Sequence, residues 1–149
     1  MEGAIVLART ILGNITRIDR CFTNYKRNNL KELNDIYPAL HAFIHYICGH
    51  PGCLQEELIE ELYVDKTTVT HHLGRLEEKG YIERRVDEND ARRRKVYPTQ
   101  KALEAAPKLH QVYHDFLGAL MDGLTEQEQD TVKALTDKLF ENAAKLVRS

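Results

Sequence analysis

One predicted helix and the hairpin after it constrain this chain more than any other feature. Asp65 is a favourable N-cap, and Gly80 is a favourable residue just beyond a helix C-terminus, so the sequence predicts a helix between them. Val69, Leu73 and Leu76 recur on one side of this helix, at the spacing of a buried stripe. The segment therefore predicts a helix with one apolar face packed on a core and one polar face left outside.

The outward face of this helix is short-chained and polar. From Lys66 to Arg75 no acidic residue is present to repel a phosphate group. Such a face suits the major groove of DNA, and we call this element the recognition helix. The candidate DNA contacts on it are Lys66, Thr67, Thr68, Thr70, His71 and Arg75.

A basic hairpin, the wing, is predicted directly after the recognition helix. Residues 82–86 alternate as a strand does, residues 87–90 form a turn cluster, and residues 95–97 can return antiparallel before Thr99 caps another helix. Cations beside a groove-binding helix indicate a clamp on phosphate or the minor groove, whereas a basic run alone is usually a solvated loop. The candidate contacts here are Arg92, Arg93, Arg94 and Lys95. Asp90 is expected to pair with a nearby wing arginine.

Several segments together resemble the MarR family of winged helix-turn-helix regulators. They are Pro51-Gly52, Gln55 to Leu58, Asp65 to Thr70, Arg75 to Gly80, Glu83-Arg84 and Asn89 to Arg92. The strong match covers residues 30–102, and outside it only the helix pattern is similar. The sequence departs from the family pattern at His71, Pro98 and Ala102.

The expected fold is mainly α with a small β-wing. We assign residues 30–107 to a winged helix-turn-helix lobe, and residues 1–29 and 108–149 to a helical dimerisation region. The terminal segments carry apolar stripes too long for one small domain to cover alone, which indicates a partner subunit. The resemblance implies the same intertwined homodimer, with recognition helices about 34 Å apart on a pseudo-palindrome.

Local signals predict the remaining elements. Asp35 is expected to cap a helix that has Pro38 in its first turn, and a short helix is expected around residues 54–62. Thr125 and Glu128 have the spacing of a capping box that begins the last helix.

Composition excludes several classes of protein. The 149 residues are 42% hydrophobic and 30% charged, which excludes a disordered or membrane chain. The net charge of −2 argues against nonspecific coating of nucleic acid but permits a local basic surface. Three cysteines and the lack of a signal-peptide pattern predict a cytoplasmic protein. No phosphate-binding loop, nucleophile elbow or metalloprotease motif is present, so we do not expect an enzyme.

The family resemblance implies repression and control by a small effector, often a phenolic or other aromatic anion, held between the lobe and the dimer helices. The residues expected to line that site are Tyr25, Tyr37, His41, His45, His110 and Tyr113. Tyrosine and histidine on helices beside a core more often serve packing. No cofactor is expected to be required.

Three alternatives stay open from the sequence. Histidine pairs four residues apart on two helices, with a nearby cysteine, resemble the zinc-responsive members of the family, and the candidate ligands are His41, His45, His110, His114 and Cys21. Cys21 lies four residues before Tyr25, a spacing that resembles the oxidant-responsive members. Winged helices also serve as protein-interaction modules without binding DNA.

Overall fold

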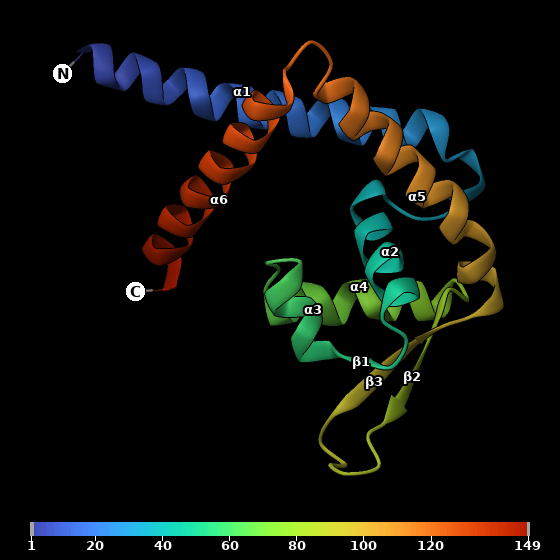
Figure 1. Ribbon diagram of the computed structural model, residues 1–149. Coiled ribbons are helices and arrows are strands. Elements are labelled where there is room, and N and C mark those ends of the chain that lie inside the picture. Colours follow the sequence, from blue (N-terminus) through green and yellow to red (C-terminus); the bar gives the residue numbers. More distant parts are fainter. Residues whose placement is uncertain (1, 149) are drawn as a thin grey trace. The chain divides into compact units, whose positions relative to one another are not determined.

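The computed structural model describes residues 2–148, with side chains from Thr10 onward, and is mainly helical with one small antiparallel sheet (Figure 1). It comprises two compact units divided between His114 and Asp115. The elements of the first are α1 (Glu2–Asn29), the 3-10 helices η1 (Lys31–Leu33) and η2 (Pro38–Leu40), α2 (His41–Gly49), β1 (Cys53–Leu54), α3 (Gln55–Glu61), α4 (Lys66–Glu78), β2 (Ile82–Val86), β3 (Arg94–Pro98) and most of α5 (Gln100–Leu120). The second contains the end of α5 and all of α6 (Glu126–Arg148).

The recognition helix α4 forms where the sequence predicts it. The Asp65 carboxylate accepts hydrogen bonds from the Thr68 amide at 2.9 Å and the Thr68 hydroxyl at 2.7 Å, which caps the first turn. At the other end Gly80 has a φ of +80°, a conformation that favours glycine.

The apolar stripe of α4 is buried in the core of the first unit. Val69, Leu73 and Leu76 are 0% exposed, as the periodicity predicts. They belong to a core that also contains residues of η1, η2, α2, α3, the sheet and α5. This packing fixes which face of α4 stays in solvent.

The wing is confirmed as the hairpin β2–β3, which projects below α4 in Figure 1. The sheet has the order β1-β3-β2, and all its strands pair antiparallel. Val96 pairs with Arg84 on one side and Cys53 on the other, and its own side chain is fully buried. The sequence did not predict β1, because two residues are too few to show strand alternation.

The prediction that Asp35 caps the helix containing Pro38 is wrong. Tyr37 is extended, with φ −70° and ψ 146°, because a residue before proline is disfavoured in the helical conformation. Helical structure therefore starts again after Tyr37, with η2, and α2 follows from His41 without a side-chain cap. The Asp35 carboxylate instead accepts a hydrogen bond from the Tyr81 hydroxyl at 2.7 Å.

The second unit begins α6 as predicted. Gly123 has a φ of +82° in the turn after α5. The Thr125 amide donates to Glu128 Oε1 at 3.0 Å, and the Glu128 amide donates to Thr125 Oγ1 at 3.1 Å. The expected capping box is thus present.

The Asp65 cap gives a pH-dependent prediction for stability. Its hydrogen bonds from Thr68 hold the pKa of Asp65 below the ordinary value of 3.8. Because folding lowers this pKa, the stability that the Asp65 cap contributes is complete above the unfolded-state pKa and is lost as pH falls through the folded-state pKa. We expect Asp65→Ala to lower the urea midpoint at about pH 7, and the difference from wild type to shrink below about pH 4.

Urea titrations followed by circular dichroism across this pH range measure the effect. Glu60→Ala, which removes an exposed carboxylate from α3, is the matched control and should leave the midpoint nearly unchanged. A difference between wild type and Asp65→Ala that stays constant down to the lowest pH would contradict the capping role.

Candidate functional site

The polar face of α4 is accessible. Lys66, Thr67, Thr70 and His71 are exposed, while Thr68 and Arg75 are half-buried. The predicted contacts on the recognition helix therefore share one helix, and most of them can reach a ligand outside the protein.

Two of the predicted threonine contacts are already engaged within the helix. The Thr68 hydroxyl donates its hydrogen to Asp65, and the Thr70 hydroxyl donates to the Lys66 carbonyl at 2.9 Å. Each hydroxyl still has a lone pair and a methyl group to offer a base edge. Thr67, which is exposed and has no such bond among the described residues, is the threonine best able to donate outward.

Arg75 lies at the last turns of α4. Its Nη1 is 3.6 Å from Glu78 Oε2, and its Nε is buried with no hydrogen-bond partner in the described part of the chain. A solvent-accessible ion pair of this length contributes little to stability, so a phosphate can compete with Glu78 for the guanidinium.

The wing tip carries exposed cations arranged by acidic side chains. Arg92 is 91% exposed, and its Nε donates to Asp90 Oδ1 at 3.2 Å. The Arg92 amide donates to the same oxygen at 3.0 Å, so Asp90 also shapes the turn. These hydrogen bonds hold the pKa of Asp90 below its ordinary value. The expected pairing of Asp90 with a wing arginine is confirmed.

The other predicted wing cations are placed on the same hairpin. Arg93 and Arg94 are exposed, and Arg94 Nη1 donates to the Ala91 carbonyl at 3.1 Å. Lys95 Nζ lies 3.8 Å from the buried carboxylate of Asp87. The basic run therefore extends over both the tip and the returning strand.

Sequence reasoning missed two arginines of β2. Arg85 pairs with Lys95 across the hairpin, and its guanidinium lies 4.4 Å from the centre of the Tyr97 ring, which adds a cation to the wing. Arg84 donates from Nη2 to Glu77 Oε1 at 3.0 Å and thereby joins the wing to α4. The strand alternation of residues 82–86 could have indicated both roles, because it places Arg84 and Arg85 on opposite faces of the hairpin.

A second cluster joins α1, α2 and α5 within the first unit. His45 Nε2 lies 3.5 Å from His110 Nδ1, and the ring of Tyr113 stacks on His45 with centroids 5.0 Å apart. Phe22 meets Tyr113 edge-on at 4.9 Å. Three of the residues predicted for an effector site, His45, His110 and Tyr113, are therefore brought together.

A buried cation borders this aromatic cluster. Lys26 is 7% exposed, its Nζ lies 4.5 Å from the centre of the Phe22 ring, and it donates to the Pro38 carbonyl at 3.2 Å. Burial lowers the pKa of Lys26. No sequence pattern pointed to this residue, because a lysine near a helix end is ordinarily solvated.

His41 lies in the same region without a partner for its ring. It is 2% exposed, and neither ring nitrogen makes a hydrogen bond to any described residue. Burial and the nearby Lys26 charge lower the pKa of His41 to about 4, against a smaller opposite effect of the Leu33 backbone, so the ring is neutral near pH 7. A neutral imidazole can both donate to and accept from a polar guest.

Other predicted residues lie elsewhere. Tyr37 is 68% exposed, and Tyr25 is half-buried against the core. Cys21 and His114 are exposed. Among the residues that the structure describes, no group of three or more His, Cys, Asp or Glu side chains could hold a metal ion, so the candidate zinc ligands are not assembled within this chain.

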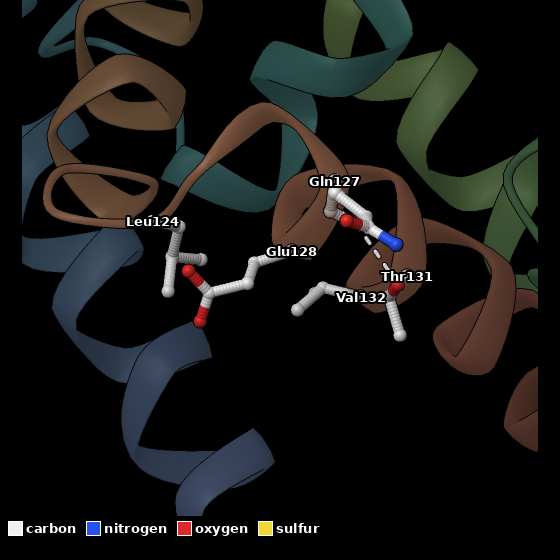
Figure 2. A pocket seen from close by; sticks show the side chains of 5 residues that line it. All are labelled: Leu124, Gln127, Glu128, Thr131 and Val132. Atoms are coloured by element: carbon white, nitrogen blue, oxygen red, sulfur yellow. Dashed lines mark hydrogen bonds between the residues drawn. The ribbon is translucent and has the colours of Figure 1, made fainter.

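An open hollow of about 420 Å³ occurs in the second unit (Figure 2). It lies at the start of α6 and is lined by Leu124, Gln127, Glu128, Thr131 and Val132. None of the predicted effector residues borders it. Within residues 2–148, no helix is both long enough and apolar enough to cross a membrane.

Comparison with known proteins places the chain among transcriptional regulators. A model of the MarR family matches residues 38–93. The transcriptional regulator HosA of Escherichia coli is 35% identical over 113 residues, which cover 73% of this chain and 81% of HosA. The uncharacterized HTH-type transcriptional regulator YybA of Bacillus subtilis is 29% identical over 132 residues, covering 89% of this chain and 87% of YybA.

Solved structures agree in fold over nearly the whole chain. A MarR family transcriptional regulator from Listeria monocytogenes, in complex with a 26mer DNA, has a TM-score of 0.82 at 26% identity, covering 90% of this chain and 89% of that one. The transcriptional regulator SlyA has a TM-score of 0.84 at 26% identity, covering 91% and 94%. With its capped recognition helix, its wing and these relatives, the chain belongs to the MarR family of transcriptional regulators.

Proposed function

We propose that this protein is a sequence-specific DNA-binding repressor that acts as a homodimer on a pseudo-palindromic operator in the cytoplasm. A small aromatic anion tunes its affinity for DNA. The observation that carries the proposal is the exposed face of α4, without an acidic residue from Lys66 to Arg75, beside a wing of exposed cations on one packed lobe. The structurally similar Listeria regulator was solved with DNA, which supports the same partner here.

The residues divide into two roles in this proposal. Thr67, Thr70 and His71 face base edges in the major groove, with Thr68 offering its methyl group. Lys66, Arg75 and the wing cations neutralise phosphates or enter the minor groove, where each neutralised phosphate releases counterions. Repression requires only that the dimer occupy its operator and block polymerase.

Fluorescence anisotropy against duplexes tiled across the DNA upstream of the protein's own gene tests DNA binding. We expect one tile to bind far more tightly than the rest, with affinity that falls steeply as salt rises. Arg92→Ala should weaken binding to every duplex and reduce the salt slope by about 1. Lys133→Ala, which removes the same charge from α6, should leave the slope unchanged.

An unchanged salt slope for Arg92→Ala would contradict the assignment of the wing to DNA. Uniformly weak binding of the wild-type protein, insensitive to salt, would favour the alternative of a protein-interaction module.

The homodimer is supported by apolar side chains that the single chain leaves in solvent. On α1, Leu12 and Ile15 are 64% and 49% exposed. On α6, Leu135, Leu139 and Leu146, which share one side of the helix, are 53%, 46% and 81% exposed. Such contiguous helical stripes are typical of a subunit interface.

Ile15→Glu should shift the protein from dimer to monomer, because a dimer would bury the new carboxylate without a partner. Light scattering coupled to size-exclusion chromatography measures the mass. Asn14→Glu places the same charge on the neighbouring exposed position of α1 and should leave the dimer intact. A wild-type protein that is monomeric at every concentration would refute the homodimer.

The effector site of this proposal is the cluster of Lys26, His41, His45, His110 and Tyr113. A buried ammonium can pair with a carboxylate, the unpartnered imidazole can hydrogen-bond a hydroxyl, and the aromatic rings can stack on an aromatic guest. The cluster thus offers the complementary chemistry for a phenolic acid.

We expect sodium salicylate to weaken operator binding, and Lys26→Met to reduce this response about 10-fold because a charge-assisted hydrogen bond is lost. Anisotropy titrations of the operator complex measure the response. Arg27→Met, next to Lys26 but exposed, is the matched control. A full response in Lys26→Met would refute the site.

Zinc is the second candidate effector, favoured by the 3.5 Å approach of His45 to His110. If zinc rather than salicylate changes operator affinity, and His110→Ala removes that change, the zinc-responsive alternative replaces the aromatic anion.

A further inference from the structure

The loop of residues 34–38, between η1 and η2, is anchored at both ends. At one end the Pro38 carbonyl accepts a hydrogen bond from the buried Lys26 ammonium at 3.2 Å. At the other end the Asp35 carboxylate accepts from the Tyr81 hydroxyl at 2.7 Å and from Lys101 Nζ at 3.2 Å. A few residues of chain therefore connect the effector cluster to Tyr81.

Tyr81 lies where the recognition helix meets the wing. It is 1% exposed, its amide donates to the Leu76 carbonyl of α4 at 2.9 Å, and its carbonyl accepts from the Thr99 amide at 3.0 Å. The next residue, Ile82, begins β2. A displacement of the Tyr81 backbone would therefore be transmitted both to the end of the recognition helix and to the start of the wing.

Lys101 reinforces the same junction from α5. Its Nζ donates to the Lys79 carbonyl at 2.8 Å and lies 4.2 Å from the centre of the Tyr81 ring, in addition to its bond to Asp35. Asp35 is thus the acceptor shared by two groups that hold the residues after α4. Burial alone would raise the pKa of Asp35, but the hydrogen bonds from Tyr81 and Lys101 hold it below its ordinary value.

The two anchors of the loop, the Lys26–Pro38 and Tyr81–Asp35 hydrogen bonds, are coupled by their chemistry. Because the Tyr81 phenol is buried, its hydroxyl has few possible hydrogen-bond partners other than the Asp35 carboxylate. If the loop moves, Tyr81 either moves with it or leaves its hydroxyl without a hydrogen bond. A carboxylate guest at Lys26 forms a stronger bond than the neutral Pro38 carbonyl does, and it would draw the ammonium away from that carbonyl. Occupation of the cluster would loosen one anchor of the loop that carries the other.

We propose that Asp35 is a positioning residue for the junction between recognition helix and wing, and that the loop of residues 34–38 couples the contacts of Lys26 to DNA affinity. This inference rests on the proposed function, and it names the route by which the effector cluster controls the DNA-binding surface.

A double-mutant cycle on the full-length protein tests the coupling. Operator affinity is measured by anisotropy for wild type, Lys26→Met, Tyr81→Phe and the double variant. Because both single variants loosen the same loop, we expect the double variant to bind about 2- to 5-fold better than the product of the two single losses predicts. The control cycle replaces Lys26→Met by Arg27→Met, whose side chain bonds Asn24 on the exposed side of α1, and should be additive.

Thermal unfolding shows whether each variant folds. If a variant of the first cycle does not fold, a second cycle with Lys26→Leu and Asp35→Ala tests the same coupling. Additive losses in a cycle of folded variants would overturn the proposal. Absence of operator binding by the wild-type protein would refute the proposed function itself, so the two failures are distinguishable.

Hydrogen exchange supplies a readout that does not require DNA. In Lys26→Met, the amides of residues 79–82 should exchange faster than in wild type, whereas Arg27→Met should leave them unchanged. Unchanged exchange at residues 79–82 in Lys26→Met would overturn the proposal, because the loop would then transmit nothing to the junction.

Discussion

The burial of one apolar stripe on α4 is the constraint on which the winged lobe depends. Val69, Leu73 and Leu76 are inaccessible to solvent, and successive helical residues turn by about 100°. Fixing the stripe therefore fixes the direction of every other side chain on the helix. The same packing that stabilises the lobe presents Lys66 and His71 to solvent.

Positive charge in this protein is local and is shaped by acidic residues. The chain has a net charge of −2, yet the wing gathers arginines and a lysine on one hairpin. Asp90 accepts from the backbone and the side chain of Arg92, and Asp87 accepts from the Asn89 amide at 3.1 Å. These carboxylates reduce the local positive charge, but they hold the tip in one shape and so leave the cations organised before a partner arrives.

Lys26 and Asp35 give the lobe a different kind of polar contact. The ammonium of Lys26 is buried under aromatic rings and donates to a backbone carbonyl, a costly position for a charge. The Asp35 carboxylate gathers a tyrosine and a lysine from segments far apart in sequence. Titratable groups with shifted pKa values, as Lys26 and Asp35 have, are more common at functional sites than in ordinary packing, which supports a regulatory role for the loop between them.

The sequence by itself determined the recognition helix, the hairpin and the capping box of α6, because each is specified by neighbours a few residues apart: Asp65 with Thr68, the alternation of residues 82–86, and Thr125 with Glu128. It also led to the pairing of Asp90 with Arg92. Only the tertiary structure decided the partner of Asp35, the burial of Lys26 and the meeting of His45 with His110. Their hydrogen-bond partners lie 46, 12 and 65 residues away in the sequence. Local periodicity carries no information on such pairs, which form only when the helices and the loops between them pack together.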